Sequence, residues 1–572
     1  MLKWRSPLIL GGVVLAIAPW LASTVQSQTA PGPLPNPIFP APPTRPAPPL
    51  LPPPEQLLQP PTAPPLPPSE LRAIPGNISV GQFEVVGSTV FTPTQLAAIT
   101  DPYLNKPLTF AELLQVASAI TQQYIDAGYI TSGAFIPANQ TFAKSGGTVR
   151  IQVLEGILET IQVNGTGRLN SDYVRDRLRR AAAPPLNVDR LVEALQLLQL
   201  DPLFKDISAE LANGSQPGTS LLTVQAPLAK TFRAEAIIDN AQSPSVGSFR
   251  RGIHLSEANL GGQGDRLDVS YFNTDGSHAV AATYTYPINA LNGTLSLSVQ
   301  PQWNKIVEKP SDSLKIRGKS RDFSLTYRQP IVQTPSQEFA LGLTLTRKDS
   351  QNFLFGRPFP ISPDADNRGR TRLSILRFSQ DYLQRSASQV FSARSQFSLG
   401  LNLFDATINR KPPDGRFLTW LGQAQWVRQF APDTSLLVSA DVQWANRPLT
   451  ALEQFSIGGP ETVRGYRQNL LLANSGAIAT AEARLPILRL RSINGLLQVV
   501  PFIDVGHSFD GLKKEERIPQ TLASVGLGLR LQIGSFATMR FDYGFPLIPI
   551  RKGGDSLQEQ GFNFSLVVGQ SF

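Results

Sequence analysis

The residues of this 572-residue chain that could do chemistry are few and widely spaced. There is no cysteine, so disulfides, thiol nucleophiles and cysteine-bound metals are excluded. The three histidines, His254, His278 and His507, are isolated and have neither metal-ligand nor catalytic spacing. We therefore predict no catalytic residue, no metal and no cofactor, and we expect the histidines to have ordinary structural roles.

One short stretch, SIGGPETVRGYRQN (residues 456–469), carries a specific chemical possibility. Glycines and a proline make it a loop, and Arg464 lies between Val463 and Gly465, just before Tyr466. A guanidinium offers a fixed fork of donors that suits a carboxylate, so it can hold a loop in one geometry, which a lysine would do less well. Gly465 lets the backbone pass close to a wall, and Tyr466 can pack while its hydroxyl stays hydrated. The alternative is an exposed turn with a solvated arginine.

The N-terminus predicts an exported protein. Lys3 and Arg5 precede the apolar run LILGGVVLAIAPW (residues 8–20), and the small-residue region LASTVQSQTA follows it. This order is typical of a secretory signal peptide over residues 1–27, with cleavage after Ser27. An uncleaved anchor helix is disfavoured because the run is shorter than the ~20 apolar residues that span a bilayer.

Residues 28–79 are rich in proline, with 19 prolines among the 38 residues 31–68. Proline lacks a backbone N–H, so we expect an extended polyproline-type linker in the periplasm, with a reach on the order of 100 Å. The alternative is a docking site for cell-wall material or for a partner.

The net charge of +9 includes no concentrated basic run, so we predict a diffuse surface or lumen charge and no nucleic-acid partner.

A strand–helix–helix–strand–strand pattern occurs twice, in residues 80–155 and 156–229. In the first copy, Thr109 and Glu112 have capping-box spacing at the start of the longer helix. The segments FEVVGST and IQVNGTG each precede a helix, and this order resembles the polypeptide-transport-associated (POTRA) domain. POTRA domains bind extended clients at a sheet edge, where backbone pairing needs no particular client sequence. Two α+β spacers without a binding role are the alternative.

Residues 230–572 form a succession of alternating segments. In SLLVSADVQW (residues 435–444), apolar side chains alternate with mostly polar ones. In an exported protein this predicts a closed transmembrane β-barrel, which satisfies its backbone hydrogen bonds in lipid. A soluble β-sandwich or lectin is the alternative. About sixteen antiparallel strands are expected, eleven before the loop and five after it, starting near Thr231, Phe249, Asp265, Ala279, Thr294, Arg321, Glu338, Arg372, Val390, Arg416, Ser435, Gly476, Leu496, Leu522, Thr538 and Gly561.

The last segment, GFNFSLVVGQSF (residues 561–572), ends the chain on Phe572. A terminal aromatic strand resembles the signal by which outer-membrane assembly machinery recognises its clients, so Phe572 is the predicted assembly signal. The apolar side chains that share one face of this strand are Phe562, Phe564, Leu566, Val568 and Phe572.

The signal peptide, the two POTRA-like modules, the barrel and the VRGY motif (Val463, Arg464, Gly465 and Tyr466) together resemble the two-partner secretion transporters. This family (TpsB, of the ShlB/FhaC/HecB haemolysin-secretion type) belongs to the superfamily that includes the assembly factor BamA. The resemblance covers roughly residues 80–572.

The resemblance implies that the loop folds into the barrel lumen and that its arginine pairs with an acidic residue of the inner wall. FIDVG (residues 502–506) and RFDYGFP (residues 540–546) resemble the family's later strand motifs. Asp504 is accordingly the first candidate partner of Arg464 and Asp542 the second. The chain departs from relatives that carry a plug helix, because EQLLQ (residues 55–59) is too short to make one, so the loop itself could close the pore.

The resemblance implies two-partner (type V) secretion, in which the POTRA domains capture an unfolded exoprotein that passes through the barrel. The family's clients are typically long β-helical adhesins or haemolysins. The implied location is the cell outer membrane, in contact with its lipid, with the linker and the POTRA domains in the periplasm. The alternatives are an outer-membrane assembly insertase like BamA, which usually has more POTRA domains, and a passive porin.

Overall fold

The computed structural model describes residues 57–59, 78–138, 140, 146–510, 520–550 and 556–572. The predicted signal peptide and most of the predicted proline-rich linker lie outside the described residues. Among the helices that are described, none is long and apolar enough to cross a membrane.

The first module is a mixed sheet packed against two helices. Strands β2 and β5 are parallel at the centre of the sheet order β3-β2-β5-β4. The predicted capping box is present, since the amide N–H of Glu112 donates to Thr109 Oγ1 (3.2 Å) and that of Thr109 donates to Glu112 Oε2 (2.7 Å). The elements are β2 (Ile78–Val86), α1 (Pro93–Thr100), β3 (Pro107–Leu108), α2 (Phe110–Asp126), β4 (Gly133–Phe135) and β5 (Gly147–Leu154).

The second module repeats this arrangement around its own core. Leu178, Leu191, Leu195 and Leu222 are fully buried in it, on one face of each helix and of the sheet. The strand order is β1-β7-β8-β6, in which β1 is Leu58–Gln59 and β6 and β8 are parallel. The elements are β6 (Ile157–Asn164), α3 (Asp172–Ala181), α4 (Val188–Gln199), β7 (Ser208–Asn213) and β8 (Thr219–Gln225).

A piece of the proline-rich region forms strand β1 (Leu58–Gln59), which pairs in parallel with β7. The amide N–H of Ala209 donates to the carbonyl oxygen of Leu57 at 2.9 Å, and the side chains of Leu57 and Leu58 are buried. We expected an extended spacer that is not part of a sheet. The difference has a local cause, because EQLLQ has no proline and its Leu58 packs in the module's core.

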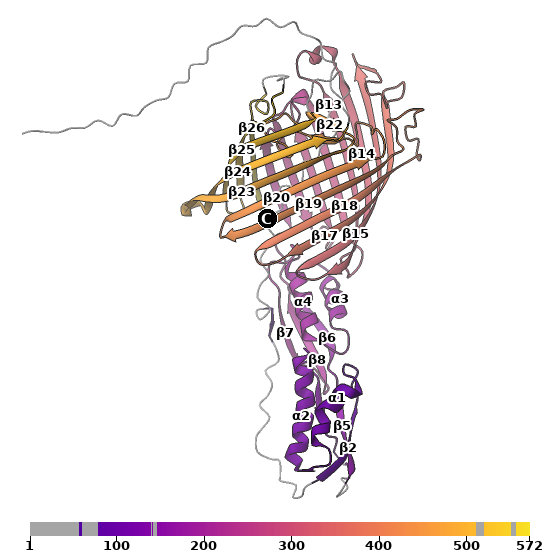
Figure 1. The fold of residues 1–572 in the computed structure, drawn as a ribbon, viewed down its shortest axis with the longest axis vertical. Helices are drawn as coiled ribbons and strands as arrows, with labels where there is room; N and C mark the ends of the chain where they lie inside the picture. The colour runs from indigo at the N-terminus through magenta and orange to yellow at the C-terminus, as the bar shows by residue number, and fades with distance from the viewer. Residues whose placement is uncertain (1–56, 60–77, 139, 141–145, 511–519, 551–555) are drawn as a thin grey trace, which may run out of the picture. The chain divides into compact units, whose positions relative to one another are not determined.

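Within the described residues, sixteen antiparallel strands close into a barrel, which confirms the predicted fold class (Figure 1). Eleven of these strands precede the VRGY loop and five follow it, as expected. The largest error in a predicted start is at β14, which begins at Arg317 rather than near Arg321. A two-residue strand, β16 (Arg357–Pro358), pairs with β15 beside this ring. The barrel strands are β9 (Phe232–Asp239), β10 (Arg250–Ala258), β11 (Arg266–Asn273), β12 (Ser277–Pro287), β13 (Thr294–Lys305), β14 (Arg317–Gln333), β15 (Gln337–Leu354), β17 (Arg370–Arg385), β18 (Gln389–Leu401), β19 (Leu418–Ala431), β20 (Thr434–Ala445), β23 (Gly476–Leu490), β24 (Gly495–Ser508), β25 (Thr521–Ile533), β26 (Ala537–Pro546) and β27 (Phe562–Ser571).

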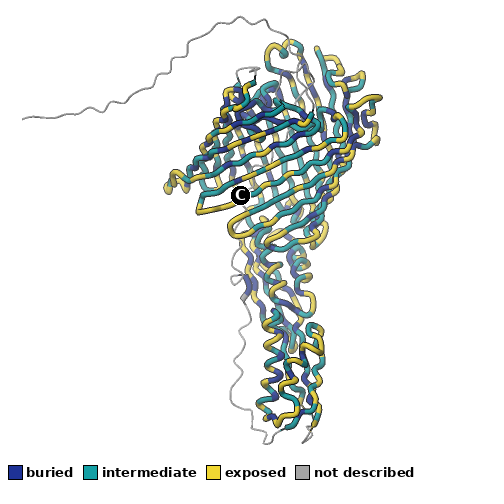
Figure 2. Tube along the Cα trace, viewed as in Figure 1, coloured by how far each residue is buried: buried dark blue, intermediate teal, exposed yellow. Residues whose placement is uncertain are grey.

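Apolar side chains cover the outside of the barrel. On β24, Ile503 and Val505 are exposed while Asp504 between them is fully buried, and on β25 Leu527 is exposed next to inward-facing glycines. Figure 2 shows this alternation of exposed and less exposed positions along many strands. An apolar outer surface and a polar interior are what a lipid bilayer requires of a barrel.

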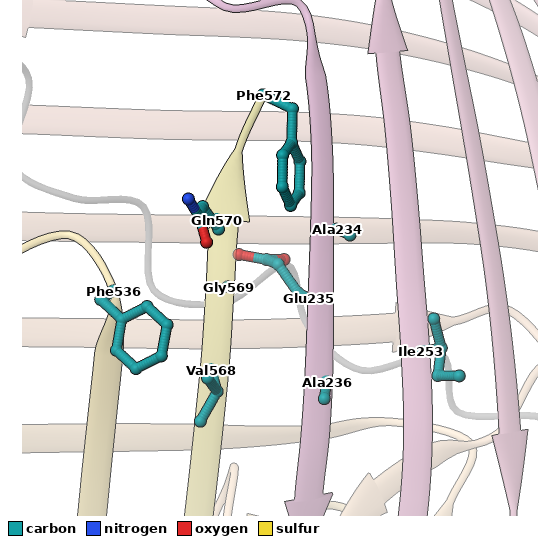
Figure 3. Close-up of a pocket in the computed structure, with 9 residues that line it drawn as sticks. All are labelled: Ala234, Glu235, Ala236, Ile253, Phe536, Val568, Gly569, Gln570 and Phe572. Atoms are coloured by element: carbon teal, nitrogen blue, oxygen red, sulfur yellow. The ribbon is translucent and has the colours of Figure 1, made fainter.

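The barrel closes where the last strand, β27, pairs with the first, β9. Gly569 lies opposite Glu235 across this seam, and a Cβ at Gly569 would approach Glu235 Cγ to 2.7 Å. An apolar hollow of about 280 Å³ lies at the seam, and Phe536 and Phe572 are among the residues that line it (Figure 3). The amide N–H of Phe572 donates to the carbonyl oxygen of Phe232 at 2.8 Å, so the chain's last residue is held against the first barrel strand.

Candidate functional site

Residues 446–475, here called the lumen loop, connect β20 to β23. They contain a two-stranded sheet of β21 (Phe455–Ile457) and β22 (Leu471–Ala473). The loop is not an exposed turn, because Ile457, Val463 and Tyr466 are buried in one cluster with Ile478 and Leu522 of the barrel wall. The apolar contacts therefore hold the loop against the inner face of β23 and β25.

Gly465 allows the loop to approach the wall closely. Its φ of 90° is in the region that favours glycine, and a Cβ there would lie 2.7 Å from the carbonyl oxygen of Gly544 on β26. Any larger residue at position 465 would have to displace the backbone of the wall. Gly465 thus sets how deeply the neighbouring Arg464 is inserted.

Arg464 makes three hydrogen bonds to Asp504, the first candidate partner. Its Nε lies 2.7 Å from Oδ2, its Nη2 lies 2.7 Å from Oδ1, and its amide N–H donates to Oδ2 at 3.1 Å. The Arg464 side chain is 4% exposed and that of Asp504 is fully buried. A two-pronged bond plus a backbone bond fixes both the side chain and the loop backbone at one carboxylate.

Asp542, the second candidate, lies farther away. Its Oδ2 is 4.0 Å from Arg464 Nη1 and receives a closer hydrogen bond, of 2.6 Å, from Arg540 Nε. Sequence reasoning missed a nearer acid, Glu482 on β23, whose Oε2 accepts a hydrogen bond from Arg464 Nη1 at 3.1 Å. Glu482 also binds Arg484, at 2.7 Å. The signal that could have found Glu482 is its place on the strand that precedes FIDVG, on the inward-facing side.

Phe502 completes the surroundings of the arginine. The guanidinium carbon of Arg464 lies 3.5 Å from the centre of the Phe502 ring, within the range of a cation–π contact. Phe502 lies two residues before Asp504 and therefore faces the same side of β24. The spacing inside FIDVG could have indicated this contact, which we did not predict.

Tyr466 is buried, and here the expectation of a hydrated hydroxyl was wrong. Its hydroxyl oxygen lies 2.8 Å from the carbonyl oxygen of Ala523 and 3.0 Å from that of Ile548. The residue itself is 1% exposed. The hydroxyl is satisfied by wall backbone instead of water, so Tyr466 is a second fixed point of the loop beside Arg464.

The residues after VRGY make further polar contacts. Arg467 Nη2 lies 2.8 Å from Glu308 Oε2, and its Nη1 lies 3.3 Å from Glu559 Oε1. The amide N–H of Gln468 donates to Gln558 Oε1 at 2.8 Å, and Gln558 Nε2 donates to the carbonyl oxygen of Gln242 beyond β9, also at 2.8 Å. The tip of the loop is thereby tied to both sides of the barrel seam.

The three histidines contact residues other than those that bind Arg464 and Tyr466. His254 contacts Ser270 and Asp268, His278 contacts Tyr271 and Asn273, and His507 contacts Thr521. In the part of the chain that the structure describes, no group of three or more histidine or acidic side chains could hold a metal ion.

The match to known families decides the identity. The family described as haemolysin secretion/activation protein ShlB/FhaC/HecB matches residues 218–531, more than half of the chain. The chain belongs to the ShlB/FhaC/HecB family. The ShlB-type POTRA domain also matches residues 78–156, over the first module.

Relatives of this ShlB/FhaC/HecB protein are transporters, among them an outer-membrane transporter. The outer membrane transporter CdiB of Dickeya dadantii is 23% identical over 445 residues, which are 74% of this chain and 75% of that protein. The heme/hemopexin transporter protein HuxB of Haemophilus influenzae is 21% identical over 472 residues, or 77% and 79% of the two chains. The predicted family, the outer-membrane location and the periplasmic POTRA modules are confirmed.

The solved structure of CdiB from Escherichia coli has the same fold as this family member. The two chains superpose with a TM-score of 0.66 over 88% of this chain and 93% of CdiB, at 22% sequence identity.

Proposed function

We propose that the protein transports a partner exoprotein across the outer membrane by two-partner (type V) secretion. The family match across the second module's last strand and most of the barrel is the observation that carries this function. The periplasmic POTRA modules capture the unfolded client, which passes through the barrel and folds outside. Folding outside the cell supplies the driving force, because no nucleotide is available at the outer membrane.

The sheet edges of the modules support capture of an extended chain. The first module ends its sheet with the three-residue strand β4, where Phe135 is 47% exposed. Near the boundary of the two modules, Leu154 and Ile157 are also exposed. Backbone pairing at a sheet edge together with apolar side-chain contacts binds an unfolded polypeptide without demanding a particular sequence.

The remaining assignments form part of the same proposal. Residues 1–27 are the signal peptide, 28–79 the linker, 80–155 and 156–229 the POTRA domains and 230–572 the barrel. Phe572 is the signal read by the barrel assembly machinery. The client is a long β-helical adhesin or haemolysin, and the protein has no enzymatic activity.

Deletion of the gene, with and without complementation by this chain, tests the function. The readout is secretion of a large protein encoded beside it that carries an N-terminal secretion domain. We expect that protein to be lost from the medium and the cell surface while other outer-membrane barrels still assemble. General loss of folded barrels would support an assembly insertase instead, and undiminished secretion of the client would support a passive porin.

A further inference from the structure

A second buried ionic contact holds the lumen loop, on wall strands other than those that bind Arg464. Glu453 lies in the first part of the loop, before β21, and its side chain is 6% exposed. Its Oε1 is 3.0 Å from Lys348 Nζ of β15, and both of its carboxylate oxygens are 2.9 Å from Arg377 Nη2 of β17. Two wall cations therefore converge on one carboxylate of the loop.

The backbone of the loop is fixed at the same point. Lys348 Nζ donates to the carbonyl oxygen of Leu452 at 3.2 Å, and Gln443 Nε2 of β20 donates to that of Glu453 at 3.1 Å. Arg377 Nη1 is itself held by Ser398 Oγ of β18, at 2.9 Å. Side chains of β15, β17 and β20 thus contact two consecutive loop residues.

The two contacts have opposite polarity and lie on different parts of the wall. At Arg464 a loop cation meets wall acids of β23 and β24, whereas at Glu453 a loop acid meets wall cations of β15 and β17. Strands β18, β19 and β20 lie between these two parts of the wall. A loop turned or shifted in the lumen would place like charges together, so the charges favour a single position of the loop.

We propose that Glu453 is a second positioning residue, which together with Arg464 holds the loop across the lumen and keeps the pore closed at rest. This inference rests on the proposed function, since a client can pass only if the loop moves. Neutralising Glu453 removes the nearest acid from both Lys348 and Arg377, whose side chains are only 16% and 18% exposed. Lys348 then keeps only the longer contact with Asp322, at 3.7 Å. Removing one partner from a buried ion pair is strongly destabilising, so the closed position is the state that loses stability.

Conductance of the purified full-length protein in planar lipid bilayers tests this role. Glu453→Gln removes the charge and keeps the shape, and Arg377→Met removes a cation from the other side. The matched control is Asp405→Asn, because the Asp405 side chain is 84% exposed and makes one long contact, of 3.4 Å, with Arg372. A shift in mobility on heating in a gel verifies that each variant is a folded barrel.

We expect Glu453→Gln and Arg377→Met to raise the open probability by about tenfold or more, while Asp405→Asn behaves like the unmodified protein. Glu453→Asp, which retains the charge, should restore most of the closure. An open probability that is unchanged in folded Glu453→Gln or in folded Arg377→Met would contradict the inference. Failure of both variants to fold would also contradict it, since the residues would then be needed for barrel assembly.

Client secretion by the same variants separates this inference from the proposed function. Unchanged conductance would reject the role of Glu453 and leave the transport function intact. Raised conductance in a protein that exports no client in any form would support the role of Glu453 and count against the transport function.

Discussion

At the scale of single residues, the site depends on how many bonds one guanidinium can make. Arg464 uses two nitrogen atoms and its amide on Asp504, a third nitrogen on Glu482, and its flat face on Phe502. A lysine ammonium could replace the charge but not this geometry. The residue type and its neighbours Gly465 and Tyr466 therefore act as a unit.

The different distances of the two aspartates predict different effects. Asp504→Asn should weaken docking of the loop by about 3–5 kcal/mol, because a buried carboxylate with three bonds to Arg464 loses its charge. Asp542→Asn should have a smaller effect on docking, since its main partner is Arg540. Because the chain has no cysteine, Val463→Cys provides a single reporter at a buried loop position. Maleimide should label it faster in Asp504→Asn than in Asp542→Asn, and equal rates would contradict the assignment.

At the scale of elements, local sequence patterns predicted the barrel strands. Pairings between residues far apart in the sequence could not be predicted. The barrel strands could be found because apolar and polar side chains alternate along them with a period of two, as on β20 and β27. The pairing of Leu58 with Ala209 could not be found, because it joins residues far apart in the sequence by backbone bonds. Glu453 was missed for the same reason, since its partners Lys348 and Arg377 belong to strands distant in the sequence.

The first module contains an element whose stability depends on pH. Glu155, just after β5, accepts hydrogen bonds from the backbone and hydroxyl of Thr89, the backbone of Val90 and the hydroxyl of Tyr124. Burial alone raises the pKa of Glu155, but these hydrogen bonds outweigh it, and the pKa lies below the ordinary value of 4.5. The carboxylate thereby holds the turn after β2 against the sheet.

Because the pKa of Glu155 is lowered in the folded state, the direction in which pH changes the stability is defined. The stabilisation by Glu155 is fully present above its unfolded pKa of 4.5 and is lost as the pH falls through the lowered folded value. Hydrogen exchange of the full-length protein, corrected for intrinsic rates, should show the amides of Thr89 and Val90 losing protection as the pH falls below 4.5. In Glu155→Gln their protection should be reduced at neutral pH and should not change in this range. Protection that is unaffected by either change would contradict this role of Glu155.

At the scale of the whole molecule, the lumen loop links the parts of the barrel. Glu453 of the loop contacts side chains of β15 and β17, and Arg464 contacts side chains of β23 and β24. Gln468 of the loop makes a third contact, near the seam of β9 and β27. From the sequence, one of these contacts could be predicted, because the VRGY motif carries the resemblance to a family. The other two have no motif and become visible when the strands are closed into a barrel.

Secretion of the client by an Arg464→Ala variant tests the central claim most directly. Arg447→Ala is the matched control, because Arg447 lies in the same loop but reaches Asp414 only at 4.0 Å. With equal amounts of heat-modifiable barrel in the outer membrane, we predict that Arg464→Ala lowers the secreted client by about tenfold or more, through loss of the buried pair with Asp504, and that Arg447→Ala leaves secretion unchanged. Normal secretion by a correctly inserted Arg464→Ala barrel would contradict the account.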